Sequence, residues 1–143
     1  MTETVKTAVT DLASLDTVAS CEEGAVMEVR HPKTNEVLRH DDGRPFTITF
    51  RGRDSEVMRD VARKQQDRRA AAYARTRSMV TSAVSERDDV ELIVAATIKW
   101  DIVYGGGVAK CDPNLYREAY TKLPWLKEQG DEFVGVRANF IKS

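Results

Sequence analysis

Cysteine and histidine are scarce in this chain, with two residues of each type among 143. Cys21 and Cys111 lie far apart and outside any Cys-x-x-Cys spacing, so the sequence predicts two reduced thiols and neither a disulfide framework nor a zinc site. His40 precedes Asp41 and Asp42, and imidazole and carboxylate groups can bind cations. The sequence lacks, however, the His-x-x-x-His spacing of a metal centre. We therefore expect no metal and no cofactor.

Long apolar runs and a dominant sign of charge are also missing. No stretch approaches the roughly 18 apolar residues that span a bilayer, and the N-terminus lacks the basic and apolar regions of a signal peptide. The 22 basic and 23 acidic residues nearly cancel, so nothing attracts the whole chain to nucleic acid or anionic membrane. We expect a soluble intracellular protein without a membrane partner, folded as a single domain over residues 1–143.

Catalytic motifs are equally absent. Gly105-Gly106-Gly107 is not followed by the Gly-Lys-Ser/Thr of a phosphate-binding loop, so we interpret it as a turn between two helices. No nucleophile elbow supports a Ser-His-Asp triad, and nothing singles out a carboxylate pair with opposed pKa requirements. The sequence therefore predicts no catalytic residues, and we do not expect an enzyme.

The hydrophobic pattern that is present predicts an α+β fold. Residues 1–20 fit either a short helix or a flexible arm. Residues 24–53 predict a small antiparallel β-meander, with period-two strands near 26–30, 37–38 and 46–50 and turns between them. Three short strands cannot bury an apolar face alone, so a helix must cover it.

The remainder, residues 54–143, predicts a mainly helical body of about four helices. Asp54-Ser55 supplies an N-cap side chain for a long helix that runs to about Val80 and breaks near 81–82. Asp88 and Glu91 resemble a capping box before a buried helix over 90–98. Asp112-Pro113 predicts the next helix start. Pro124 opens a last amphipathic helix that continues through Phe140.

Two groups of side chains could bind a partner. Arg59, Arg63 and Arg68 belong to a basic cluster on the long helix. Such a stripe can contact phosphates, but interspersed acids and the lack of aromatic residues favour a solvated face or an acidic protein partner, so we do not expect nucleic-acid binding. Trp125, Phe133 and Phe140 could anchor a partner, with burial in the core as the competing interpretation.

Several segments resemble the small tail assembly chaperones of long-tailed bacteriophages. One group comprises HPKTNEVL at 31–38, ITFRGRDS at 48–55 and the Arg/Gln-rich helix through QQDRR at 65–69. The other comprises Trp100-Asp101, the glycine turn, LPWLKEQ at 123–129 and RANF at 137–140. The closing Pro-Trp-Leu-x-x-Gln helix that ends on Arg-Ala-Asn-Phe carries the resemblance most specifically. Together the segments cover most of residues 24–141.

The resemblance implies a non-enzymatic protein made in the cytoplasm of an infected bacterium. Such proteins bind the tape measure protein, keep it soluble, help to recruit tail tube protein and are generally absent from the mature virion; we also expect this chain to form a homo-oligomer. The alternative is a structural virion protein, either a tail or a head-tail completion component, which stays in the particle. A nucleic-acid-binding regulator is the third hypothesis, and an enzyme is the fourth.

Overall fold

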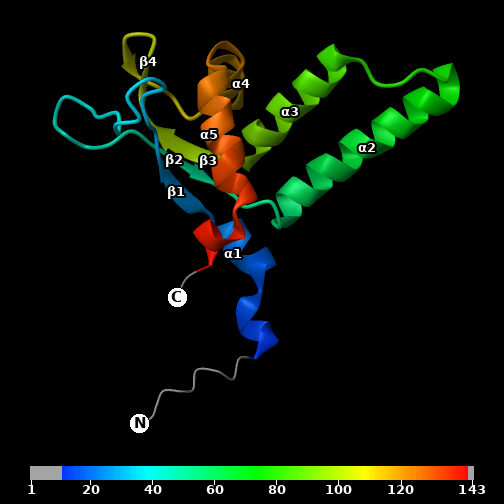
Figure 1. Cartoon of the computed structure of the whole chain (residues 1–143), viewed down its shortest axis with the longest axis horizontal. Coiled ribbons are helices and arrows are strands. Elements are labelled where there is room, and N and C mark those ends of the chain that lie inside the picture. Colours follow the sequence, from blue (N-terminus) through cyan, green and yellow to red (C-terminus); the bar gives the residue numbers. More distant parts are fainter. Residues whose placement is uncertain (1–10, 142–143) are drawn as a thin grey trace.

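The computed structural model describes residues 11–141 and confirms the α+β class, with a three-stranded antiparallel sheet and a mainly helical body (Figure 1). The elements are η2 (Leu12–Leu15), α1 (Thr17–Glu23), β1 (Ala25–Glu28), β2 (Thr47–Phe50), α2 (Glu56–Thr76), α3 (Ser82–Ala96), β3 (Thr97–Asp101), β4 (Val103–Tyr104), β5 (Gly107–Val108), α4 (Pro113–Lys122), α5 (Pro124–Gly135) and η3 (Arg137–Phe140).

The sheet has the order β1-β2-β3, and its third strand differs from the expected one. Residues 37–38 do not form a strand of their own; Val37 makes only an isolated bridge to Arg30. Pro45 lies at the next bridge and has no N–H to extend a ladder. The third strand is β3, so Ile98, which we had placed in a helix, lies in the sheet. Periodicity alone does not separate a buried helix from a buried strand in such an apolar run.

The core lies between one face of this sheet and helices α3, α4 and α5. Ile48 of β2 and Trp100 of β3 are register partners, and the Trp100 ring meets Tyr116 of α4 edge-on with centroids 4.5 Å apart. The other fully or nearly fully buried apolar residues include Met27, Phe50, Ile93, Ala119, Tyr120, Leu126, Val134 and Phe140. The prediction that helices cover the apolar face of the sheet is therefore confirmed.

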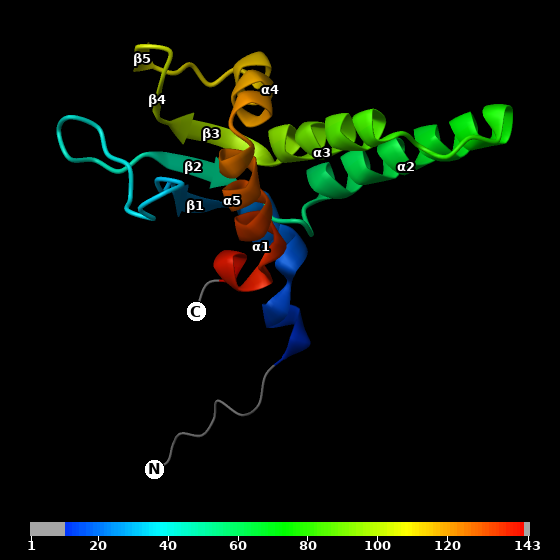
Figure 2. The ribbon, with the colours of Figure 1, turned by 45° about the horizontal axis from the view of Figure 1, so that its top comes forward.

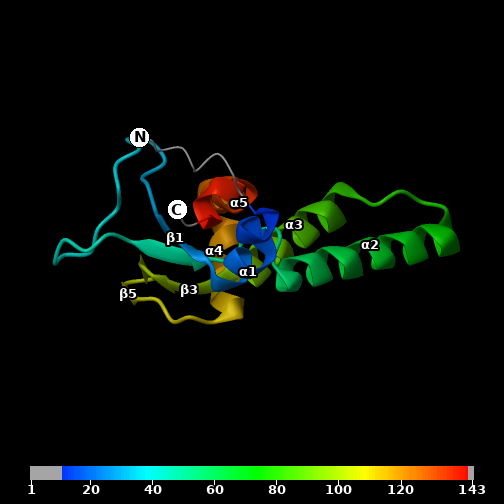
Figure 3. The ribbon, with the colours of Figure 1, turned by 90° about the horizontal axis from the view of Figure 1, so that it is seen from below.

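Helices α2 and α3 form a hairpin, here called the helical arm (residues 56–96), that projects from the body in all three ribbon views (Figure 1, Figure 2 and Figure 3). Ser55 caps α2 as predicted, with its hydroxyl accepting from the N–H of Met58 at 3.2 Å. The helix ends at Thr76, earlier than expected, because Arg77 turns left-handed with φ of 59°. From residue 66 to residue 87 no side chain is fully buried.

The start of α3 also differs from the expectation. Thr81 is the N-cap residue, and the helix begins at Ser82 rather than at the predicted capping box. Asp88 lies inside the helix with only 4% of its surface exposed. Its carboxylate accepts from Arg69 Nε at 2.9 Å, so this acid joins α3 to α2 and does not cap a helix.

Three remaining elements refine the sequence prediction. The first ten residues lie outside the described part of the chain, and residues 17–23 form helix α1. The glycine turn joins strands β4 and β5 of a small hairpin, not two helices, with φ values of 72° at Gly105 and 95° at Gly106. The last helix ends at Gly135, and Phe140 belongs to the separate 3-10 turn η3.

Candidate binding surfaces

A groove of about 600 Å³ lies between α5, strand β1 and the loop that follows β1, and we call it the α5–β1 groove. Trp125 and Phe133 of α5, two of the predicted partner-binding residues, both line it and are half-buried. Its other lining residues are Met27, Glu28, Arg30, His31, Pro32, Asn35, Glu128, Gln129, Glu132, Val136 and Asn139. The groove therefore combines aromatic walls with charged side chains.

Phe140 has a different position from the other two aromatic candidates. Only 2% of its surface is exposed, and its ring meets Phe133 edge-on with centroids 5.6 Å apart. Phe133 in turn lies 6.1 Å from Phe50 of the sheet. Phe140 therefore supports a groove residue from inside the core and is not exposed to a partner in this conformation.

Gln129, which lines the groove, makes a pair of hydrogen bonds to the backbone. Its Oε1 accepts from the N–H of Arg30 at 3.0 Å, and its Nε2 donates to the Arg30 carbonyl at 2.7 Å. This is how a neighbouring strand would satisfy both backbone groups of one residue. Arg30 extends its guanidinium to the carbonyl of Asn35 at 3.0 Å, which holds the loop beside the groove.

The charge of the groove is predominantly negative. Glu28, Glu128 and Glu132 line it, and all three are exposed. Arg30 is the one Lys or Arg among the lining residues. Exposed carboxylates of this kind contribute little to folding and instead select the charge of whatever enters.

The three arginine candidates lie on a separate surface, on helix α2 of the helical arm. Arg59, Arg63 and Arg68 are all exposed. Arg63 pairs with Asp60 one turn earlier, and Arg68 lies 3.8 Å from Asp88. Helix α2 carries six Lys or Arg residues against three acids, so the arm presents a basic helix to solvent.

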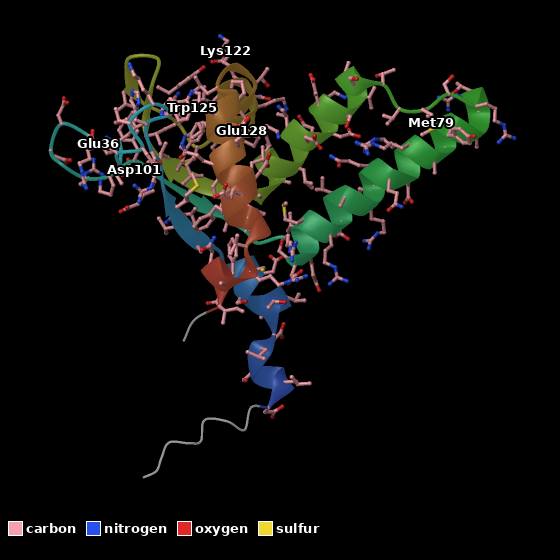
Figure 4. The ribbon with its side chains drawn as sticks, in the orientation of Figure 1. Glu36, Met79, Asp101, Lys122, Trp125 and Glu128 are labelled. Atoms are coloured by element: carbon pink, nitrogen blue, oxygen red, sulfur yellow. The ribbon has the colours of Figure 1, made fainter. Side chains whose placement is uncertain are left out.

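Apolar side chains accompany these charges at the end of the arm. Met79 is 79% exposed, and Tyr73 and Val80 are also largely exposed. Figure 4 shows Met79 at the tip, far from Trp125 and Glu128 on α5. The arginine and aromatic candidates therefore form two separate surfaces, which the sequence did not indicate.

Two carboxyl groups with clearly lowered pKa values, Asp54 and Glu91, belong to ion pairs with arginine. Hydrogen bonds from Arg137, and then from Thr17, lower the pKa of Asp54 from 3.8 to about 2. Arg117 of α4 likewise lowers the pKa of Glu91 of α3 through its side-chain hydrogen bonds. Arg137 and Arg117 each join one element of the fold to another through these ion pairs, and a catalytic acid or base requires a different arrangement.

The residues considered as a cation site also have structural contacts. His40 is nearly buried, packs edge-on against Phe46 at 4.8 Å, and directs Nε2 to Asp101 at 3.2 Å. Arg44 bridges Asp42 and Asp101 at 2.8 and 2.7 Å. In residues 11–141 no group of three or more His, Cys, Asp and Glu side chains could hold a metal ion.

Cys21 is buried and Cys111 is exposed, and both are free thiols. The Cys111 thiol donates to the Trp100 carbonyl at 3.3 Å. Burial raises the pKa of the Cys21 thiol, which lowers its reactivity at neutral pH.

No helix in the described residues is long and apolar enough to cross a membrane.

Sequence reasoning missed the role of Gln129 and the negative charge of the groove. Gln129 stood inside the most specific segment of the resemblance, but glutamine on an amphipathic helix gives no signal that it will bind a distant backbone.

A comparison of the chain with protein-family models, with curated proteins and with solved structures found no match in any of the three.

Proposed function

We propose that this chain is a non-enzymatic assembly chaperone of a long-tailed bacteriophage. It acts in the cytoplasm of the infected bacterium, binds the tape measure protein, keeps it soluble, and helps to recruit tail tube subunits. It self-associates while free and leaves before the virion is mature. The sequence resemblance supplies the identity of the client, and the surfaces described above support a role in protein binding.

The observation that carries this proposal is the projecting helical arm. The arm from residue 66 to residue 87 has no fully buried side chain, so the core does not account for its length. Ordering such a segment costs conformational entropy that burial elsewhere must offset. Exposed arginines together with Tyr73 and Met79 suit a surface that closes on a helical partner with acidic and apolar side chains.

Co-expression of this chain with the tape measure protein from the same phage genome tests the proposal. Size-exclusion chromatography with light scattering then measures whether the two proteins co-elute and in what stoichiometry. We expect the client to remain soluble only in the presence of the chain and to elute with it. A client that precipitates regardless, while this chain elutes alone, would remove the proposal's main support.

The alternative role as a structural virion protein makes an opposite prediction for finished particles. Quantitative mass spectrometry of purified virions should find this chain absent if it is a chaperone. A fixed number of copies per particle would instead support a tail or head-tail completion component.

A further inference from the structure

Within residues 11–141, strand β1 has a strand partner on one edge only, because it is the outer strand of the sheet (Figure 2). Successive residues of a strand direct their backbone groups to alternate edges. Val29 donates its N–H to the Phe46 carbonyl at 2.9 Å, on the side of β2. Val26, Glu28 and Arg30 therefore direct their N–H and carbonyl groups to the open edge.

These three residues differ in which groups hydrogen-bond their outward-facing backbone N–H and carbonyl. Both groups of Arg30 are bonded to the side-chain amide of Gln129. No hydrogen bond from elsewhere in residues 11–141 reaches the outward groups of Val26 and Glu28. Val26 is also 58% exposed, so this part of the edge is accessible from solvent. The Gln129 amide shows that hydrogen-bonding groups fit beside β1 in the position of a further strand.

The space beside this edge is already hollow. Glu28, Arg30, Met27 and Phe133 line both the α5–β1 groove and a second hollow of about 510 Å³ that also includes Val26. An added strand would lie about 4.8 Å from β1, within this space. Its side chains on one face would meet the apolar surface of Met27 and Phe133.

The charges beside the edge determine which strand fits. Glu28 on β1 and Glu128 and Glu132 on α5 outnumber Arg30, whose guanidinium is already bonded to the Asn35 carbonyl. Like charges across an interface suppress wrong partners, whereas opposite charges favour the right ones. An acidic segment would therefore be disfavoured, and one with Lys or Arg beside apolar residues would be complementary.

We propose that the open edge of β1 captures an extended, positively charged peptide segment of a client protein as a fourth strand, in the manner of β-strand addition. The backbone groups of Val26 and Glu28 supply the ladder, and Glu128 and Glu132 select lysine or arginine side chains. This inference rests on the proposed function for the identity of the client, and it adds the chemistry of the segment that the groove takes. It gives the chain a second contact besides the helical arm.

The test uses the full chain and a short capped peptide of alternating valine and lysine, followed by NMR. We expect the amides of Val26 and Glu28 to shift and to become protected from hydrogen exchange. A peptide with glutamate in place of lysine should bind at least about tenfold more weakly, as should one N-methylated at every second amide. Equal binding of either control peptide would overturn the proposal.

Two variants test the same edge from the side of the protein. Val26→Pro removes an outward N–H without removing a bond to β2, and proline is tolerated at such edge positions. We expect Val26→Pro to weaken peptide binding at least about tenfold, and its control Val26→Thr to stay within about twofold. The pair Glu128→Lys and Glu132→Lys, which does not depend on the fold of β1, should weaken binding of the lysine peptide and strengthen that of the glutamate peptide.

Each result separates this inference from the proposed function. The chain could bind the peptide, lose that binding in Val26→Pro, and yet fail to capture the tape measure protein. That result would contradict the proposed function and still support the peptide site. Capture of the client by the unmodified chain and by Val26→Pro alike, without peptide binding, would overturn the strand addition alone. A chain that dimerises through β1 and does not release its partner to the peptide would also overturn it.

Discussion

Gln129 on α5 binds both backbone groups of Arg30 just beyond β1, with distances of 3.0 Å to the N–H and 2.7 Å to the carbonyl. Two residues far apart in sequence thus hold the last helix against the edge of the sheet. The contact is exposed, so water can replace it in part. Its contribution is that of ordinary hydrogen bonds, about 0.5–1.5 kcal/mol each.

Gln129→Ala should therefore lower the free energy of unfolding by about 1–2 kcal/mol. Gln129→Glu keeps the acceptor for the Arg30 N–H but places a carboxylate beside the Arg30 carbonyl, and we expect it to be no more stable than Gln129→Ala. Urea unfolding at neutral pH measures both variants. A Gln129→Glu variant as stable as the unmodified chain would show that the hydrogen bond from Gln129 to the Arg30 carbonyl contributes nothing to stability.

Gly130 lets α5 approach the sheet closely. A Cβ at this position would lie 2.9 Å from Cζ of Phe50 and 3.1 Å from Cδ1 of Ile93. Overpacking of this kind costs about 1–3 kcal/mol, against a gain of up to about 1 kcal/mol in helix propensity. We expect Gly130→Ala to lower the free energy of unfolding by about 1–2 kcal/mol.

Gly135 is the matched control, because a Cβ there would meet no atom within 4 Å. Gly135→Ala should leave the stability unchanged or raise it by up to about 1 kcal/mol. Thermal unfolding of the two variants side by side measures the difference. If both glycines tolerate alanine equally, the close packing of α5 on Phe50 is not rigid.

Arg69 stabilises the helical arm through the nearly buried carboxylate of Asp88. Removal of Arg69 takes away the closer of the two cations beside this buried carboxylate, and the remaining Arg68 at 3.8 Å, together with the partial exposure of Arg69, reduces the cost. We expect Arg69→Ala to cost about 1–3 kcal/mol and to speed amide exchange along α2. Arg59→Ala, at an exposed position on the same helix, should change the stability by less than about 0.5 kcal/mol. Equal exchange in the two variants would contradict the importance of this ion pair.

Asp54 makes the stability of the fold depend on acid pH. Its carboxylate accepts from Arg137 Nε at 2.7 Å and from Nη2 at 3.1 Å, which joins the start of α2 to η3. The pKa is lowered from 3.8 to about 2 in the folded state. The stabilisation is therefore complete above the unfolded pKa and is lost as the pH falls through this interval.

Asp54→Asn should remove this contribution, which we place at about 1 kcal/mol because the exposed Arg137 side chain is screened by solvent. The difference in unfolding free energy between the unmodified chain and Asp54→Asn should be constant near neutral pH. It should shrink as the pH falls below about 4. Urea titrations over that range measure it, and a difference that grows toward low pH would have the wrong sign.

Local signals predicted the parts of the fold that depend on neighbouring residues. Asp54-Ser55 and Asp112-Pro113 were recognised as helix starts because a cap is a contact within a few residues. The strand at β2 alternated cleanly between Phe, Ile and Thr. The predicted helix ends were less accurate. Arg77 adopts the left-handed conformation that ends α2, but it is not a glycine, so the sequence lacks the usual signal for a helix end there.

The features that failed depend on distant residues. Asp88 resembled a cap from its neighbours, but its carboxylate is bound by Arg69 of another helix. Strand β3 followed an apolar helix without a break, and only its pairing with β2 distinguishes it from more helix. For the binding surfaces, composition identified Trp125 and Arg59, but it could not show that they lie on separate surfaces or that Phe140 is buried.

The measurement that tests the central claim most directly is the soluble fraction of the tape measure protein on co-expression with two forms of this chain. The unmodified chain should keep the client soluble. A variant with Arg59→Glu and Arg63→Glu, whose changes are both at exposed positions and leave the cations beside Asp88 in place, should fold normally and leave most of the client in the pellet. A client that is equally soluble with either form or with no chain at all would contradict the account.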